Sequence, residues 1–293
     1  MTSSGSITTI VLSQSEWVDR RDAHRARIDP LIAPRLNRRS NGAKHPVDDF
    51  LFDYYANSPG QLRTWHPGIG VVLEGADEYA RKPHYLRTPD GVTLDPELLV
   101  KKQPLIAHAT SIMQATQHRP PMTGCFALHE WAMVLGLSNE EVRHNSWPLR
   151  LNPAQVADTI KDQGLRCTHF DAFRFYTAEA IPLNAHQLSR ANQLEFEQPG
   201  CLHATMDLYR WAFTVSPLIE SELVADAFEL ARRTRALDMQ ASPYDLIDLG
   251  LEPIRVETAD GRAEYQRRQL EVIDQGRAMR ERLLHRLEAL CKT

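Results

Sequence analysis

Three histidines of this sequence stand close to a carboxylate in stretches that are otherwise apolar. The pairs are His129 with Glu130, His169 with Asp171, and His203 with Asp207. An imidazole beside a carboxylate can act as a general base that the carboxylate orients, or it can bind a metal ion with the carboxylate's support. The sequence therefore predicts acid–base or metal chemistry inside the protein. Hydrogen-bonded core histidines without any catalytic role are the alternative.

The segment "GCLHATMDLYRWAF" carries a polar stripe along an apolar helix. His203, Asp207 and Arg210 fall at i, i+4 and i+7, a spacing that places side chains on one helical face. The stripe lies beside the apolar face and not opposite it, so we expect it to border a core or a cavity. It can serve as a site or as a buried salt-bridge network.

Four residues are the candidate ligands of a metal ion: His129, His169, Asp171 and His203. Two histidines and one carboxylate can bind iron, and a histidine-rich set can bind zinc. The sequence contains no H-E-x-x-H, no C-x-x-C and no H-x-E followed by P-C-x-x-C. Iron or zinc is therefore predicted from residue types alone, without support from a known spacing.

Aromatic residues occur beside acidic and turn residues near the first third of the chain. Tyr54, Tyr55 and Trp65 are expected to be exposed, where they can stack on a flat ring or anchor a loop. In "LRCTHFDAFRFYT", the alternation predicts a strand with His169 and Asp171 on one face.

The hydrophobic periodicity predicts a mainly α protein with a minor β component, forming a multi-helical single domain over residues 11–293 after a flexible tail, residues 1–10. A helix capped by Ser15 is expected to be interrupted near Pro30. The last helix is expected to pack on its own domain, because Gly276 interrupts its apolar pattern; a coiled-coil or partner-docking role is the alternative. Asn152 and Gly164 mark the ends of another helix. A small hairpin or sheet is expected only between residues 70 and 95, with "PDG" as a turn.

The composition sets broad limits on function. A net charge of −4 gives no global signal of a polyanion partner, so a DNA contact would depend on the Arg-rich segment over residues 20–44. That segment reads as a phosphate-contacting arm or as a solvated helix face. The four cysteines suggest no disulfide framework, and no apolar run approaches the roughly 20 residues of a membrane span. The start of the chain does not read as a signal peptide. We expect a cytoplasmic protein without a membrane partner.

Several longer motifs together resemble an actinobacterial family commonly labelled 3-methyladenine DNA glycosylase. The motifs are "KHPVDDFLFDYY", "SPGQLRTWHPGIGVVLEG", "GCFALHEWAMVLG", "LRCTHFDAFRFYT", "EQPGCLHATMDLYRWAFTVSP" and "LDMQASPYDL". The resemblance extends from about Leu12 to the end of the chain. It implies a hydrolase of base-excision repair that removes alkylated purines from DNA. The chain departs from other alkylpurine glycosylases, because it has neither a helix-hairpin-helix loop followed by an Asp nor an array of HEAT-type repeats.

A glycosylase needs a carboxylate near the sugar, a platform for the extruded base and cations for phosphate. Asp171 or Asp207 can provide the carboxylate, with His169 or His203 as the orienting imidazole. Substrate binding falls to Tyr54, Tyr55, Trp65 and Arg210. Two other classes remain open: a metal-dependent enzyme, with iron or zinc, acting on a small molecule, and a helical interaction protein whose buried polar groups specify packing.

Overall fold

The computed structural model describes residues 9–138, 140–142 and 146–292, and these confirm a mainly helical protein with a small sheet. The α-helices of this part of the chain are α1 (Gln14–Ser40), α2 (Phe50–Tyr54), α3 (Pro59–Arg63), α4 (Asp77–Ala80), α5 (Glu97–Gln117), α6 (Leu128–Ala132), α7 (Pro153–Gln163), α8 (Phe170–Phe173), α9 (Gln193–Phe196), α10 (Leu202–Val215), α11 (Ser221–Gln240) and α12 (Ala259–Cys291). Short 3₁₀ helices cover Ile181–Leu183, Arg190–Asn192 and Ile247–Leu249.

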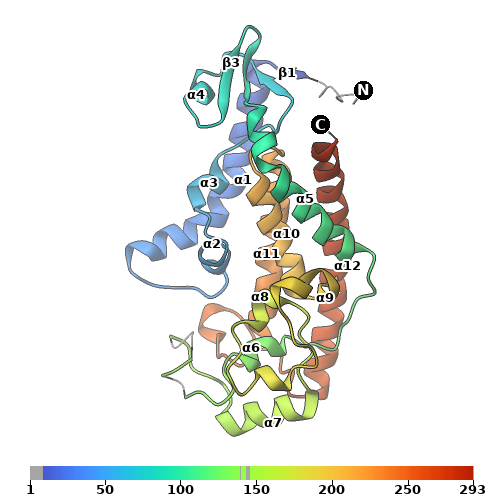
Figure 1. The fold of residues 1–293 in the computed structure, drawn as a ribbon. Coiled ribbons are helices and arrows are strands. Elements are labelled where there is room, and N and C mark those ends of the chain that lie inside the picture. Colours follow the sequence, from blue (N-terminus) through green and yellow to red (C-terminus); the bar gives the residue numbers. More distant parts are fainter. Residues whose placement is uncertain (1–8, 139, 143–145, 293) are drawn as a thin grey trace.

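Four long helices, α5, α10, α11 and α12, form the centre of the molecule (Figure 1). α10 packs against α11 and α12, and α5 packs against α12. Their apolar faces bury a core that includes Met206, Phe228 and Leu283, each with at most 1% of its surface exposed. Burial of these faces stabilises helices whose isolated propensities are modest.

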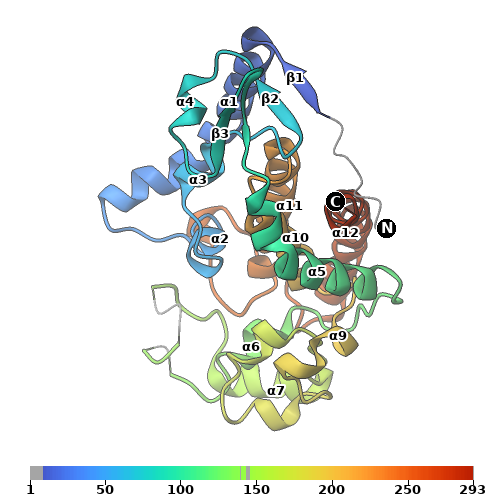
Figure 2. The ribbon, with the colours of Figure 1, turned by 45° about the horizontal axis from the view of Figure 1, so that its top comes forward.

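A small sheet with its own apolar core lies at one end of the molecule (Figures 1 and 2). Its strands are β1 (Ile10–Leu12), β2 (Val71–Leu73), β3 (Tyr85–Thr88) and β4 (Gly91–Leu94), in the order β1-β2-β4-β3. β3 and β4 form the hairpin predicted at "PDG". β1 was not predicted as a strand. It pairs in parallel with β2, so Ile10 is part of the sheet; residues 1–8 of the predicted tail lie outside the described residues.

The first helix differs from its prediction in both its start and its length. Ser13, not Ser15, caps α1 in a capping box with Glu16, and the helix continues through Pro30 and Pro34. Its arginines contact carboxylates, several of them on α11: Arg20, Arg21, Arg25, Arg27, Arg35 and Arg38. These ion pairs engage the cations on which the predicted phosphate contact depended.

The opposite end of the molecule is built largely from the described residues between 124 and 200 and contains a second large core (Figure 2). α7 has the predicted N-cap Asn152, with Gly164 just after its end. The strand predicted around His169 is wrong, because this segment turns into α8 with His169 at its N-cap. Side chains of α10 and α11 contribute to this core as well as to the central one, so both helices are common to the two.

The last helix, α12, runs from Ala259 to Cys291 without a break at Gly276. None of the helices in the described ranges has the length and apolar character that crossing a membrane requires.

Candidate functional site

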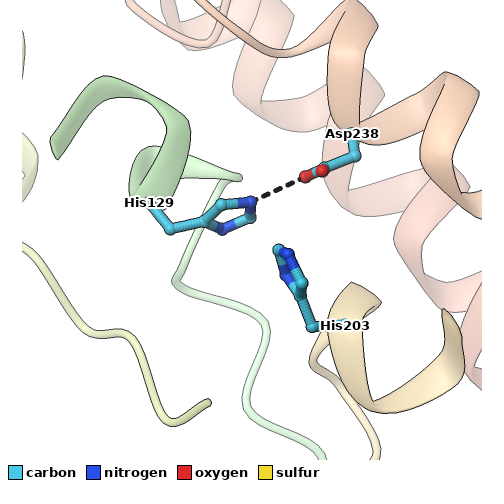
Figure 3. A group of neighbouring side chains, drawn as sticks. All are labelled: His129, His203 and Asp238. Carbon is cyan, nitrogen blue, oxygen red and sulfur yellow. Dashed lines mark ion pairs between the residues drawn. The ribbon is translucent and has the colours of Figure 1, made fainter. Parts of the chain in front are cut away.

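Two histidines and one aspartate from three distant elements meet inside the protein. His129 comes from α6, His203 from the first turn of α10, and Asp238 from the end of α11, and each is at most 3% exposed. One potential ligand atom of each lies within 4.8 Å of the other two. Figure 3 shows the two imidazole rings and the carboxylate directed toward a common space. We call these three residues the first triad.

The polar atoms of the first triad approach each other without satisfying one another. Nε2 of His129 lies 2.9 Å from Oδ1 of Asp238, the distance of an ion pair, although neither atom has a hydrogen-bond partner of good geometry. Nδ1 of His203 also has none. Buried polar atoms are nearly always paired, and of these three Nδ1 of His203 has neither a hydrogen bond nor an ion pair.

The charges around the first triad set the protonation of its members. Burial lowers the pKa of His129, but the attraction of Asp238 outweighs it and the pKa is raised well above its ordinary value. Burial, followed by repulsion from His129, lowers the pKa of His203 well below its ordinary value. Burial opposes ionisation of Asp238, whereas the attraction of His129 prevails and lowers its pKa. His203 is therefore a neutral imidazole, the form that binds metals.

A fully buried arginine holds the aspartate of this triad in place. Nη1 of Arg235 donates to Oδ2 of Asp238 at 2.5 Å and to Oε1 of Glu130 at 2.6 Å. Only one oxygen of Asp238 is used in this way, so its Oδ1 remains directed toward the two histidines. Glu130, the sequence neighbour of His129, thus supports the site through Arg235.

The chain is constrained just before both histidine-bearing helices. Phe126 and Ala127 precede α6 with φ of 47° and 55°, a left-handed conformation that is costly for residues other than glycine and that clusters at functional sites. Before α10, the side-chain oxygen of Gln198 accepts from the backbone N–H of Met122 and of Gly200. These contacts fix the directions in which α6 and α10 begin.

A second buried group, His169, Glu197 and Asp207, lies beside the first, and we call it the second triad. Nδ1 of His169 is 3.8 Å from Oε2 of Glu197, and Nε2 is 3.7 Å from Oδ2 of Asp207. The His169 ring is fully buried, and neither nitrogen has a hydrogen-bond partner. The ring stacks on that of His203 with centroids 5.2 Å apart, so the two triads are in contact.

The carboxylates of the second triad are held by neutral and cationic donors. The Tyr55 hydroxyl donates to Oδ1 of Asp207 at 2.7 Å, and Nη1 of Arg210 donates to Oδ2 at 3.3 Å. Arg210 also donates to Asp171 at 3.0 Å. Nε2 of Gln193 donates to Oε2 of Glu197 at 2.8 Å, and burial raises the pKa of Glu197.

A cavity of about 260 Å³ reaches the first triad. His203, Glu130 and Arg235 line it, and Phe50, Tyr54 and Phe175 provide aromatic walls. Asp171 lines the cavity as well, held by Arg190 and Arg210 at 3.0 Å each. Lys44 and Asp53 also line the cavity, so aromatic walls and several charged groups converge there. A concave site that combines apolar walls with placed polar groups suits a small molecule.

In the structure, none of the three histidines faces the carboxylate that the sequence suggested as its partner. His129 faces Asp238 and not Glu130, and His169 faces Glu197 and Asp207 and not Asp171. His203 joins His129 and Asp238, whereas Asp207 on the same helix turns toward His169. Of the four predicted metal ligands, His129 and His203 meet, and His169 lies in the second triad. Asp171 belongs to neither group found among the described residues.

The predicted substrate-binding residues are dispersed. Tyr54 lines the cavity, whereas Tyr55 and Arg210 instead bind Asp207. Trp65 was expected to be exposed, which is wrong: it is fully buried, packs in the core beside the sheet and donates to Glu222. It therefore offers no surface on which a base could stack.

Asp238, Arg235 and Glu197 were not among the residues predicted from the sequence. Arg235 and Asp238 lie at i and i+3 on α11 among buried apolar residues, the same signal that drew attention to α10. Glu197 directly precedes "QPG" at the end of α9 and carries no periodic signal. No family model, curated protein or solved structure matches this chain. The site must be interpreted from its own geometry.

Proposed function

We propose that this chain is a metal-dependent enzyme that acts on a small molecule, with a divalent iron or zinc ion held by His129, His203 and Asp238. The convergence of these three buried residues, with nitrogen and oxygen atoms that lack hydrogen-bond partners, carries the proposal. Two ligand atoms about 2.1 Å from one ion lie roughly 3 Å apart in octahedral geometry. The 2.9 Å between His129 and Asp238 fits this value.

The surroundings of the first triad favour a catalytic over a purely structural metal. Two histidines and one carboxylate are three ligands, and catalytic sites characteristically keep positions free for water or substrate. His203 forms part of the cavity wall, so a molecule in the cavity reaches the triad. When bound, the ion supplies Lewis-acid chemistry to an oxygen of substrate or water.

The residues around the cavity can bind and orient a small substrate. Phe50 and Tyr54 stack with centroids 4.9 Å apart and offer an apolar surface to one side of it. Arg235 is paired with Glu130 and Asp238, so its role is to fix Asp238 and not to attract an anion. The cavity volume of about 260 Å³ limits the substrate to a small molecule.

Metal binding can be tested with the purified full-length protein after chelator treatment. Cobalt(II) should bind with visible absorption bands of nitrogen and oxygen ligation, and His203→Gln should abolish the bands that arise from the first triad. His24→Gln is the matched control, because His24 is equally buried but lies on α1 near Leu62. Addition of azide should shift the bands if the ion keeps an open position. Unchanged cobalt spectra in His203→Gln would refute the assignment.

A nucleobase N-glycosylase is the second candidate, and the aromatic cavity is the observation that favours it. The rings of Phe50, Tyr54 and Phe175 line the cavity and offer surfaces to a flat base, and Asp171 lines it as well. It is ranked second because Arg190 and Arg210 already engage Asp171, which weakens its field at a sugar. Release of 3-methyladenine from alkylated DNA, lost in Asp171→Asn, would support this function. Absence of release at low salt would exclude it.

A further inference from the structure

The second triad presents a buried imidazole that no neighbouring group satisfies. His169 is fully buried, and its two nitrogens lie 3.8 Å and 3.7 Å from Glu197 and Asp207. These separations are too long for hydrogen bonds. A single ion would take only one of these two nitrogens, and one potential ligand atom from each of His169, Glu197 and Asp207 lies within 4.8 Å of the other two. An imidazole left in this state without a cation would be costly.

The charge balance around the two triads points in the same direction. Five carboxylates are buried here, and Arg235 and Arg210 each pair with two of them. Arg210 is only partly buried, with 28% of its side chain exposed. The carboxylates are Glu130, Asp171, Glu197, Asp207 and Asp238. Among the described residues no arginine lies at ion-pair distance from Glu197, so the buried charge of this carboxylate must be offset by a bound proton or by a cation.

We propose that His169, Glu197 and Asp207 bind a second divalent cation, which makes the site a two-metal centre. The relevance of this second ion to catalysis rests on the proposed function, whereas its binding can be measured on its own. One nitrogen and two oxygen ligands form a harder set than the first triad, and they suit manganese or iron. The stacked rings of His169 and His203 separate the two ions.

The second ion lies away from the substrate cavity. His169, Glu197 and Asp207 do not line that cavity, whereas His203 does. The ion therefore acts on the first site through the His203 ring and through the field that it adds. Tyr55, Gln193 and Arg210 fix the two carboxylates and leave the His169 nitrogens as the unsatisfied atoms.

The competing interpretation is an imidazolium at His169 held between two carboxylates, with no metal. Manganese(II) binding to the chelator-treated, full-length protein distinguishes this imidazolium from a metal site. The bound ion is counted by elemental analysis and observed by electron paramagnetic resonance. The two-metal centre predicts two equivalents in the wild-type protein and one in Glu197→Gln. Glu257→Gln is the matched control, because Glu257 is a partly buried glutamate paired with Arg150 outside both triads. Glu257→Gln should retain two equivalents of manganese(II).

The outcomes also separate the second site from the first. His203→Gln should bind one equivalent of manganese(II) in place of two. The double variant His203→Gln with Glu197→Gln should bind none. One equivalent in the wild type, unchanged by Glu197→Gln and lost in His203→Gln, would overturn the second site and leave the proposed function intact. No bound metal in the wild type would overturn both. If Glu197→Gln fails to fold by circular dichroism, Asp207→Asn provides the same comparison.

Discussion

Gly276 provides a test in which helix propensity and packing predict opposite results. It lies inside α12, where replacement of glycine by alanine in an exposed helix stabilises by about 1 kcal/mol. A Cβ at this position, however, would lie 2.8 Å from Oγ1 and 3.3 Å from Cγ2 of Thr205 on α10. Thr205 is 1% exposed and has little room to move. Overpacking of this kind costs about 1–3 kcal/mol, so Gly276→Ala should be neutral or destabilising by up to ~2 kcal/mol.

A double-mutant cycle isolates the clash. Thr205→Ala removes Oγ1 and Cγ2 and leaves the Cβ of residue 205. The methyl group of an alanine at position 276 would lie 3.6 Å from that atom, which is an ordinary contact. Oγ1 of Thr205 has no hydrogen-bond partner, so its removal sacrifices no hydrogen bond. In the Thr205→Ala background, Gly276→Ala should therefore stabilise by about 1 kcal/mol. Urea unfolding measures each free energy. Stabilisation of the same size in both backgrounds would refute the close approach of α12 to α10.

Three further predictions concern other parts of the site and fold. Gly200→Ala should lower the free energy of unfolding by about 1–3 kcal/mol, because a Cβ would overlap the Met122 carbonyl oxygen; an unchanged urea midpoint would contradict this contact. Arg235→Met, measured in excess chelator, should lower the free energy of unfolding by about 3–5 kcal/mol, because two buried carboxylates lose their cation. Glu130→Gln should lower it much less. Equal losses in the two variants would argue against this ion-pair network. Burial lowers the pKa of His66 to about 4. The unfolded chain binds this proton below its ordinary pKa of about 6.5, so up to about 3 kcal/mol of stability is lost as pH falls from 6.5 to 4. His66→Gln should reduce the slope of stability against pH in that window, and an unchanged slope would exclude this origin.

Local features of the sequence were predicted where the cause is itself local. Asn152 and Gly164 bound α7 because a cap is set by the nearest backbone groups. Pro30 was expected to interrupt α1 and does not, and α12 likewise continues through Gly276. α1 is held on α11 by ion pairs such as that between Arg27 and Asp226, and Gly276 permits the close approach to Thr205. Contacts with distant segments therefore override a local cost of this kind.

The site shows the same division between sequence and tertiary structure. Residue types alone indicated that His129, His169 and His203 are polar groups within apolar segments, and their burial confirms this. The sequence did not determine which carboxylate each would face. On a helix, residues one or two apart point in different directions, so neighbours such as His129 and Glu130 diverge. Asp238 reaches His129 only because α11 packs beside α6 and α10, an arrangement set by burial of apolar faces along the whole chain.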